Sequence, residues 1–192
     1  MVKLDKIYTR TGDKGKTRLA TGEPVDKWTP RVTAYGAVDE ANSTLGLAAL
    51  HAKADIWLAD AISRIQNDLF DLGADLSTPD RGKDLGWEPL RITAQQVKRL
   101  ELEIDEMNIG IEPLDSFILP GGSPLAAHLH LARATTRRAE RSVAQAYASD
   151  DEVISDEALA YINRLSDWLF VAARRANDNG QSDVKWVPGK NR

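Results

Sequence analysis

The feature of this chain that most constrains its fold is an apolar spacing of three and four residues that recurs from Pro30 onward. Such spacing places apolar side chains on one face of an α-helix. Connectors rich in Gly, Pro and Asp separate the periodic segments, and almost no stretch reads as a strand. The pattern predicts five helices of about 18 to 26 residues each, over about residues 31–53, 56–75, 93–110, 124–148 and 155–177.

Helix start signals support two of these segments. Thr93 followed by Gln96 three residues later matches a capping box, and Ser123 followed by Pro124 places an N-cap before a proline at the first helical position. Gly110 ends the third segment. Helices of this length with short connectors pack as an up-and-down bundle. We therefore predict an all-α protein with the architecture of an up-and-down five-helix bundle.

Length and composition narrow the class of protein further. The 192 residues suit one domain, residues 1–192, and a net charge of −4 argues against general nucleic-acid binding without excluding a local basic pocket. The absence of cysteine excludes disulfides, thiolate metal sites and a cysteine nucleophile, and three histidines are too few and too poorly spaced for a zinc site. We find no apolar run typical of a secretory signal or a membrane span, so we expect a cytoplasmic protein with no membrane partner.

The fourth segment contains a group of arginines in the sequence ARATTRRAERS. Arg133, Arg137 and Arg141 are four residues apart and project from one side of a helix, with Arg138 close by. Three guanidinium groups on one face repel each other unless an anion lies against them. A triphosphate would satisfy them, because guanidinium offers paired donors to phosphate oxygens. A solvated helix face and an internal ion-pair network with acids of the first helix are the alternatives.

Two other helices carry polar faces. In the first helix, Asp39 and Asn42 share a helical phase with Gly46, which suggests a close neighbour or ligand, although plain surface residues explain the pattern equally well. The last helix carries a polar stripe with one aromatic, formed by Asn163, Asp167, Phe170 and Arg174. An asparagine in mid-helix normally has a tertiary reason to be there, and that reason is structural as often as functional.

The N-terminal segment YTRTGDKGKT invites comparison with the Walker phosphate loop. The match fails, because Arg10 stands where the first glycine is needed and no apolar strand precedes it. Its glycines can still expose backbone N–H groups to an anion, with further donors at Thr9, Thr11, Lys14, Lys16 and Thr17. A flexible basic loop is the alternative. Farther along, Phe117 in FILPGG either caps the bundle core or acts as a movable wedge beside a ligand pocket.

Together these segments resemble the ATP:cob(I)alamin adenosyltransferases of the PduO type. The matching motifs are YTRTGDKGKT, AYGAVDEANS, FILPGG, ARATTRRAER and YINRLSDWLFVAAR, in the family's order over about residues 7 to 176, and WVPGK near the C-terminus also resembles the family. Ala41 departs from the pattern, since the family more often has leucine there, which affects local packing. The resemblance implies a ferritin-like, cobalamin adenosyltransferase-like bundle that assembles as a homotrimer with active sites between subunits.

The resemblance also implies a reaction and a set of site residues. Such enzymes transfer the 5′-deoxyadenosyl group of ATP to the cobalt of cob(I)alamin, giving adenosylcobalamin and triphosphate, with Mg²⁺ as cofactor. By similarity, ATP is bound by Thr9, Arg10, Thr11, Gly12, Asp13, Gly15, Thr17, Arg18, Lys27, Arg137, Arg138, Ala139, Glu140, Arg141 and Asn163. Asp39 and Arg133 resemble an ion pair across the subunit interface, and Phe117 and Phe170 resemble aromatics that contact cobalamin. The catalytic set is then Arg137, Asp39, Arg133 and Phe117, with no residue assigned as a metal ligand.

In this interpretation the chain divides into an ATP-binding N-terminal loop (1–29), a helix bundle (30–178) and a C-terminal tail (179–192). Cob(I)alamin is itself a strong nucleophile, which agrees with the absence of cysteine. A flavoprotein reductase and an adenosylcobalamin-dependent enzyme are the protein partners such a reaction would need. Two other functions remain open: another helical-bundle ATPase or phosphotransferase, and a non-catalytic corrinoid carrier.

Overall fold

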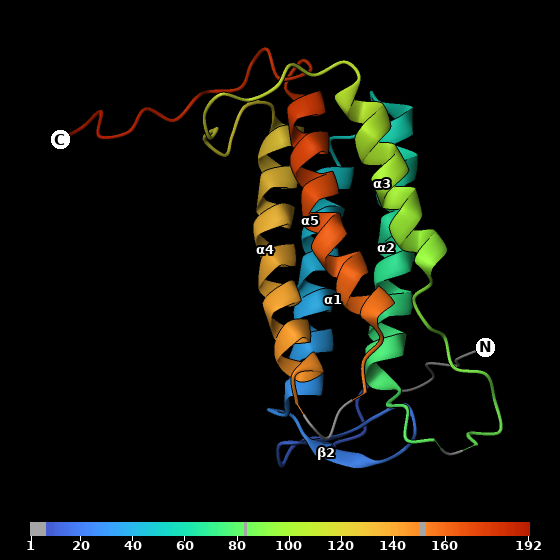
Figure 1. Cartoon of the computed structure of the whole chain (residues 1–192). Helices are drawn as coiled ribbons and strands as arrows, with labels where there is room; N and C mark the ends of the chain where they lie inside the picture. Colours follow the sequence, from blue (N-terminus) through green and yellow to red (C-terminus); the bar gives the residue numbers. More distant parts are fainter. Residues whose placement is uncertain (1–6, 83, 150–152) are drawn as a thin grey trace.

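The computed structural model describes residues 7–82, 84–149 and 153–192. It contains five long helices that lie side by side (Figure 1), and the predicted all-α five-helix bundle is confirmed. The helices are α1 Pro30–Ala49, α2 Ile56–Ser77, α3 Ala94–Asn108, α4 Pro124–Tyr147 and α5 Asp156–Ala176.

Successive helices run in opposite directions along the bundle. α1 packs against α4 and α2, and α5 packs against α4 and α3. Figure 1 shows the connection from α3 to α4 and the C-terminal segment at one end of the bundle, and the N-terminal strands at the other. This arrangement decides which functional segments can meet within one chain.

The helix ends follow local capping chemistry. Thr93 and Gln96 form the predicted capping box, and the Ser123 hydroxyl accepts a hydrogen bond from the Ala126 N–H at 3.1 Å. α1 ends at Ala49, before the predicted end near residue 53, because residues 48–55 form successive tight turns that lead into α2. α3 has 15 residues and is shorter than predicted.

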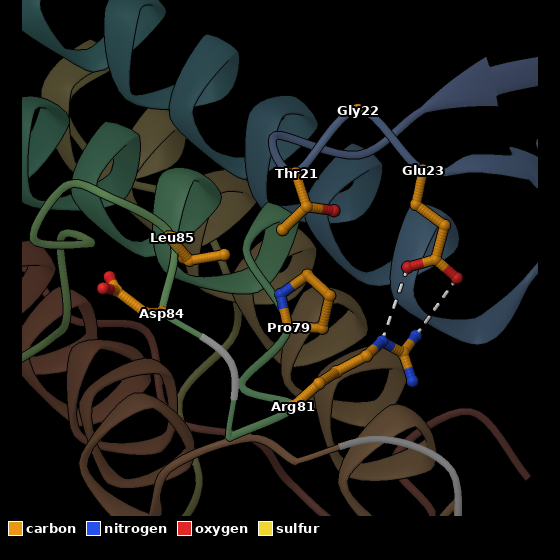
Figure 2. A pocket seen from close by; sticks show the side chains of 7 residues that line it. All are labelled: Thr21, Gly22, Glu23, Pro79, Arg81, Asp84 and Leu85. Atoms are coloured by element: carbon orange, nitrogen blue, oxygen red, sulfur yellow. Dashed lines mark hydrogen bonds and ion pairs between the residues drawn. The ribbon is translucent and has the colours of Figure 1, made fainter.

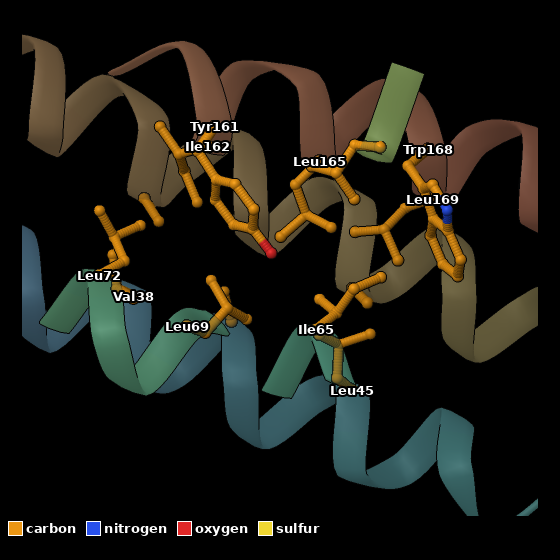
Figure 3. Packing of buried hydrophobic residues seen from close by; sticks show 14 of the residues in the cluster. Val38, Leu45, Ile65, Leu69, Leu72, Tyr161, Ile162, Leu165, Trp168 and Leu169 are labelled. Atoms are coloured by element: carbon orange, nitrogen blue, oxygen red, sulfur yellow. The ribbon is translucent and has the colours of Figure 1, made fainter. Parts of the chain in front are cut away.

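The core lies where α5 faces α1 and α2 (Figure 3). The predicted apolar stripes of α2 and α5 are buried as expected. A polar contact crosses this core, since the Asp68 carboxylate accepts hydrogen bonds from the Tyr161 hydroxyl at 3.1 Å and the Gln96 amide at 3.0 Å. Burial, together with the nearby Asp68 charge, raises the pKa of Tyr161 well above its ordinary value. The contact joins α2, α3 and α5.

The N-terminal segment contains a small hairpin that the sequence interpretation missed. Strands β1 Lys16–Arg18 and β2 Pro24–Asp26 pair antiparallel, with a turn at Gly22, whose φ is +82°. Leu19 is buried, and the Ala20 N–H donates to the Ser77 carbonyl at 2.9 Å. These tertiary contacts anchor a turn whose local sequence has no strand periodicity.

Within the described ranges, none of the helices has the length and apolar character needed to cross a lipid bilayer.

Candidate active site

A cavity of about 450 Å³ lies at the hairpin, within the size range of small-molecule sites. Its lining comes from the N-terminal segment and includes most of the residues predicted there to bind ATP. The lining residues are Thr9, Thr11, Gly12, Lys16, Thr17, Arg18, Pro24 and Lys27. Three are cationic and none is acidic. Lys16 is paired with Asp26, so Arg18 and Lys27 supply the positive charge that suits an anion.

Two glycines shape this cavity. Gly15 has a φ of +77°, and a Cβ there would lie 3.2 Å from the Trp28 ring. A Cβ at Gly12 would lie 3.1 Å from the Lys27 ammonium, so glycine lets that cation approach the loop backbone. Arg10 and Asp13, both exposed, and Gly15 belong to the same loop but are not among the residues that line the cavity.

The hairpin is fastened to the start of α1. Thr17 hydrogen-bonds the Tyr35 hydroxyl, and burial raises the pKa of Tyr35 above its ordinary value. Within the hairpin, the Lys16 ammonium and the Asp26 carboxylate form an ion pair at 2.5 Å. Tyr35 therefore helps to hold the cationic cavity at one end of the bundle.

On α4, the arginines divide into two kinds. Arg138 forms an ion pair with Glu40 of α1, as the ion-pair alternative expected. The guanidinium of Arg137 has no ion-pair partner among the residues that the structure describes, and Arg141 donates only to the Arg137 carbonyl, at 2.9 Å. Arg137 and Arg141 are exposed, so their charge remains available to an anionic ligand.

Glu140 and Asn163 connect this helix to α5. The Asn163 side-chain amide donates to the Glu140 carboxylate at 2.7 Å. Glu140 is three residues after Arg137 and next to Arg141, so these residues and Asn163 share one face. The predicted Ala139 is instead buried in the core, and Arg138 is directed to Glu40 of α1. This face, defined by Arg137, Glu140, Arg141 and Asn163, is called the arginine face below.

Arg133 lies farther along α4, toward the α3–α4 connection. Its guanidinium is 5.9 Å from the centre of the Phe170 ring, and its Nε is buried without a hydrogen-bond partner in the described part of the chain. Burial lowers the pKa of Arg133, and the positive charge of Arg137 lowers it further. Asp39 is exposed on α1, and within this chain Asp39 and Arg133 form no ion pair with each other.

Phe117 lies in the connection between α3 and α4 and is 78% exposed. Its ring packs at a tilt against Trp186, with centroids 6.2 Å apart, and the Trp186 N–H donates to the Phe117 carbonyl at 2.7 Å. Phe117 therefore does not cap the bundle core, and the C-terminal segment holds its backbone. Nothing in the local spacing of FILPGG or WVPGK predicts this contact, which joins segments about 70 residues apart.

Arg174 corrects one part of the predicted polar stripe on α5. It is buried rather than on the solvent side, with its Nε donating to Asp183 at 2.9 Å and Nη2 donating to the Glu112 carbonyl at 2.9 Å. Asn177 completes this junction by accepting from the Ser123 N–H at 2.9 Å. Arg174 is thus a structural residue that fixes the C-terminal segment.

A second cavity, of about 520 Å³, lies between the hairpin turn and the α2–α3 connection (Figure 2). No residue predicted to bind ATP or cobalamin lines it. Arg81 is paired with Glu23 at 3.4 Å, as Figure 2 shows, so its charge is already neutralised. The cationic cavity and the arginine face remain the better candidates for an anion site.

The fold is that of a helical-bundle protein whose two cationic surfaces suit a polyanionic ligand, and comparison with known proteins gives the family. The family model described as cobalamin adenosyltransferase matches residues 7–176. The chain therefore belongs to the cobalamin adenosyltransferase family, in its PduO-type branch.

Individual relatives agree with this assignment. A corrinoid adenosyltransferase from Mycobacterium bovis is 48% identical, over 100% of this chain and 97% of the relative. The corrinoid adenosyltransferase PduO of Salmonella typhimurium is 41% identical, over 88% of this chain and 48% of that protein. The solved structure of a variant PduO-type ATP:corrinoid adenosyltransferase from Lactobacillus reuteri, complexed with cobalamin and ATP, has a TM-score of 0.82 and 40% identity, covering 94% of this chain and 99% of the other.

Proposed function

We propose that this chain transfers the 5′-deoxyadenosyl group of ATP to the cobalt of cob(I)alamin, giving adenosylcobalamin and triphosphate. The observation that carries the proposal is the arginine face of this chain, where the positive charges of Arg137 and Arg141 are available to an anion. The chain also belongs to the PduO-type family. Triphosphate is the leaving group of this reaction, and its departure from C5′ develops negative charge. Preorganised cations at that position lower the barrier.

The ATP-binding residues would act from two surfaces. The cationic cavity, with Lys27 and Arg18, would hold one part of the nucleotide, and the arginine face would hold the triphosphate. Paired guanidinium donors suit phosphate oxygens, so Arg137 would make the contact that tightens as the phosphate leaves. Asn163 would orient Glu140 on the same face.

Cob(I)alamin itself supplies the nucleophile, so the role of the protein is to hold the cobalt next to C5′ of ATP. Phe117 and Phe170 are the aromatics proposed to contact the corrin ring, and the exposure of Phe117 leaves its ring available to a flat ligand. Holding cobalt and C5′ in an aligned contact removes most of the entropy cost of a reaction between two molecules.

The arginine face has one carboxylate, that of Glu140, so a bound Mg²⁺ would be held there mainly through phosphate oxygens. Within the described ranges, no three His, Cys, Asp or Glu side chains are grouped closely enough to hold a metal ion. Mg²⁺ commonly binds one or two carboxylates together with substrate phosphates and water. Glu140 is the carboxylate that would hold it, through the oxygen that Asn163 leaves unbonded. The bound ion would neutralise charge on the triphosphate.

The proposed site requires more than one copy of the chain. Figure 1 places the α3–α4 connection, which carries Phe117, and the hairpin at opposite ends of the bundle. The corrinoid proposed to bind at the first and the ATP proposed to bind at the second must nevertheless come into contact. A homotrimer with active sites between subunits resolves this, and Asp39 of one copy would pair with Arg133 of the next. The half-buried Arg133, with its unpartnered Nε, supports an additional partner.

The other expectations from the sequence stay predictions. These are one domain over residues 1–192, with an ATP-binding loop at 1–29, a bundle at 30–178 and a tail at 179–192. They also include a cytoplasmic location, a flavoprotein reductase that supplies the reduced corrinoid, and an adenosylcobalamin-dependent enzyme that receives the product.

The test mixes the protein with ATP, Mg²⁺ and chemically reduced cobalamin. The expected product contains a light-sensitive cobalt–carbon bond and appears together with triphosphate. Release of ADP and phosphate without that bond would instead identify an ATPase or phosphotransferase. Cobalamin binding without turnover, independent of Arg137, would identify a carrier.

A further inference from the structure

His130 is a buried titratable residue that the proposed reaction does not use. It lies on the core-facing side of α4 and is 3% exposed. Neither of its ring nitrogens has a hydrogen-bond partner among the residues that the structure describes. A buried polar group without a partner is rare in a native protein and calls for a physical explanation.

The surroundings of His130 keep the ring neutral. Burial lowers its pKa and the Arg133 guanidinium lowers it further, while Asp183 acts in the opposite direction and does not outweigh them. A neutral imidazole carries one N–H donor and one nitrogen acceptor. His130 therefore has both kinds of hydrogen-bonding capacity unused.

His130 and Arg133 flank the same aromatic ring. The His130 ring meets Phe170 edge to face, with centroids 6.2 Å apart, and the Arg133 guanidinium is 5.9 Å from the Phe170 centre. The Nε of Arg133 is also buried without a partner. The cluster thus combines one apolar ring with three buried nitrogens, two of His130 and one of Arg133, that lack a hydrogen-bond partner among the described residues.

Packing alone does not account for a histidine at this position. Phenylalanine could keep the edge-to-face contact with Phe170 without desolvating two nitrogens. The polar groups are therefore better explained by a partner from outside the chain. Phe170 and Arg133 are only partly buried, so a shift of these two side chains would open the His130 ring to a ligand.

The corrin macrocycle matches this cluster chemically, because it has a flat ring with carboxamide groups around its rim. We propose that His130 binds the carboxamide rim of the corrinoid, with one ring nitrogen donating to the oxygen of one carboxamide and the other accepting from the nitrogen of a second, while Phe170 packs against the ring. This inference rests on the proposed function and assigns to His130 a role in corrinoid recognition. Two neighbouring amides on the rim can use both functions of a neutral imidazole, one as acceptor and one as donor.

The test measures corrinoid binding in the presence of Mg²⁺ and ATP, by the absorbance change of cob(II)alamin. His130→Phe keeps the ring contact but removes both nitrogens, and His130→Gln keeps a donor and an acceptor. We expect His130→Phe to raise the Kd for cob(II)alamin roughly 5- to 30-fold, the effect of one or two lost hydrogen bonds. We expect His130→Gln to recover most of that loss and the Kd for ATP to stay unchanged.

A set of cobalamin monocarboxylates, each with one rim amide hydrolysed, identifies the amide that donates to His130, because a carboxylate can accept a hydrogen bond but cannot donate one. Wild-type protein should bind one member roughly 5- to 30-fold more weakly than cobalamin, and His130→Phe should no longer distinguish that member from cobalamin. Thr136→Val is the matched control, because Thr136 is another buried polar residue of α4 whose hydroxyl has no hydrogen-bond partner within the described ranges. Its corrinoid affinity should equal that of wild type.

Wild-type corrinoid affinity in His130→Phe would overturn the inference and leave His130 as a packing residue. Equal weakening in Thr136→Val would overturn it too, since the effect would then be a general disturbance of α4. The proposed function fails separately, if wild-type protein forms no adenosylcobalamin. Binding of the monocarboxylates is measured without turnover, so the two failures are distinguishable.

Discussion

Arg137→Ala should abolish most of the activity while leaving the fold intact. The side chain is exposed, and its guanidinium has no ion-pair partner among the described residues. Its removal therefore breaks no ion pair with a described residue, and an exposed substitution of this kind changes stability by about 0.5 kcal/mol or less. It also relieves Arg133 of a neighbouring positive charge that lowers its pKa.

The expected loss of activity is much larger than this. A preorganised donor aimed at developing charge contributes about 2.7–4 kcal/mol, which is roughly 10²- to 10³-fold in kcat. Arg137→Lys keeps the charge but loses the paired donors, so its activity should fall between those of Arg137→Ala and wild type. The difference between the two variants separates the contribution of geometry from that of charge.

The assay follows formation of adenosylcobalamin from cob(I)alamin and ATP, with urea unfolding measured on the same samples. Lys98→Ala is the matched control, because Lys98 is an exposed cation on α3 whose surface pair with Glu101 is 3.3 Å long. Lys98→Ala should leave the activity close to that of wild type and change the free energy of unfolding by no more than about 1 kcal/mol. If Arg137→Ala loses stability in proportion to activity, the residue belongs to a structural network and the reasoning fails.

Three further changes test the structure itself. Arg31→Ala should destabilise the bundle by about 3 kcal/mol or more in urea unfolding, because buried Arg31 donates to the Leu76 carbonyl at 2.6 Å; a loss below about 1 kcal/mol would contradict this. Burial alone would raise the pKa of Asp55, but hydrogen bonds from Arg175 and the Leu58 N–H outweigh it and lower that pKa. The ionised Asp55 carboxylate thus stabilises the fold above about pH 4, and this effect disappears as the pH falls. The free energy of unfolding of Asp55→Asn should be lower than that of wild type by about 0.5–1 kcal/mol at pH 7, and the difference should shrink toward pH 3. Burial and Arg133 lower the pKa of His130, so on acidification the histidine is protonated in the unfolded chain before it is protonated in the folded one. Wild type should therefore lose stability between about pH 7 and 5 relative to His130→Phe. The same pH dependence of the free energy of unfolding in both proteins would refute this.

The helices could be predicted because their signals are local. Thr93 and Gln96 are three residues apart, and the hydrogen bonds of the capping box form between neighbours in sequence. Apolar periodicity likewise reports the face that each helix buries, and the stripe of α5 is buried where it was expected. Such features depend little on the rest of the fold.

The hairpin and the pairing of the charged residues could not be predicted in the same way. Leu19 is buried by contacts that the segment does not make alone, and strand periodicity is absent from three-residue strands. Helical spacing places Arg137 and Arg138 next to each other but does not say that Glu40 faces only one of them. Arg174 fits the polar stripe by spacing, and Asp183 turns it into a buried structural residue. In each case the deciding partner lies on another element.

The order of the motifs along the chain also hides how far apart they lie in space. α4 has 24 residues and extends roughly 36 Å at 1.5 Å per residue, with the Phe117 connection at its start and the hairpin beyond its end. A cobalt–carbon bond requires the cobalt and C5′ of ATP to be in contact, so a corrin held only at Phe117 and a nucleotide held only at the hairpin of the same chain would lie too far apart to react. We infer that the Phe117 end of one copy meets the hairpin end of another. An Asp39–Arg133 pair between copies would fix that alignment, and it would supply the partner that Arg133 does not find in Asp39 of its own chain.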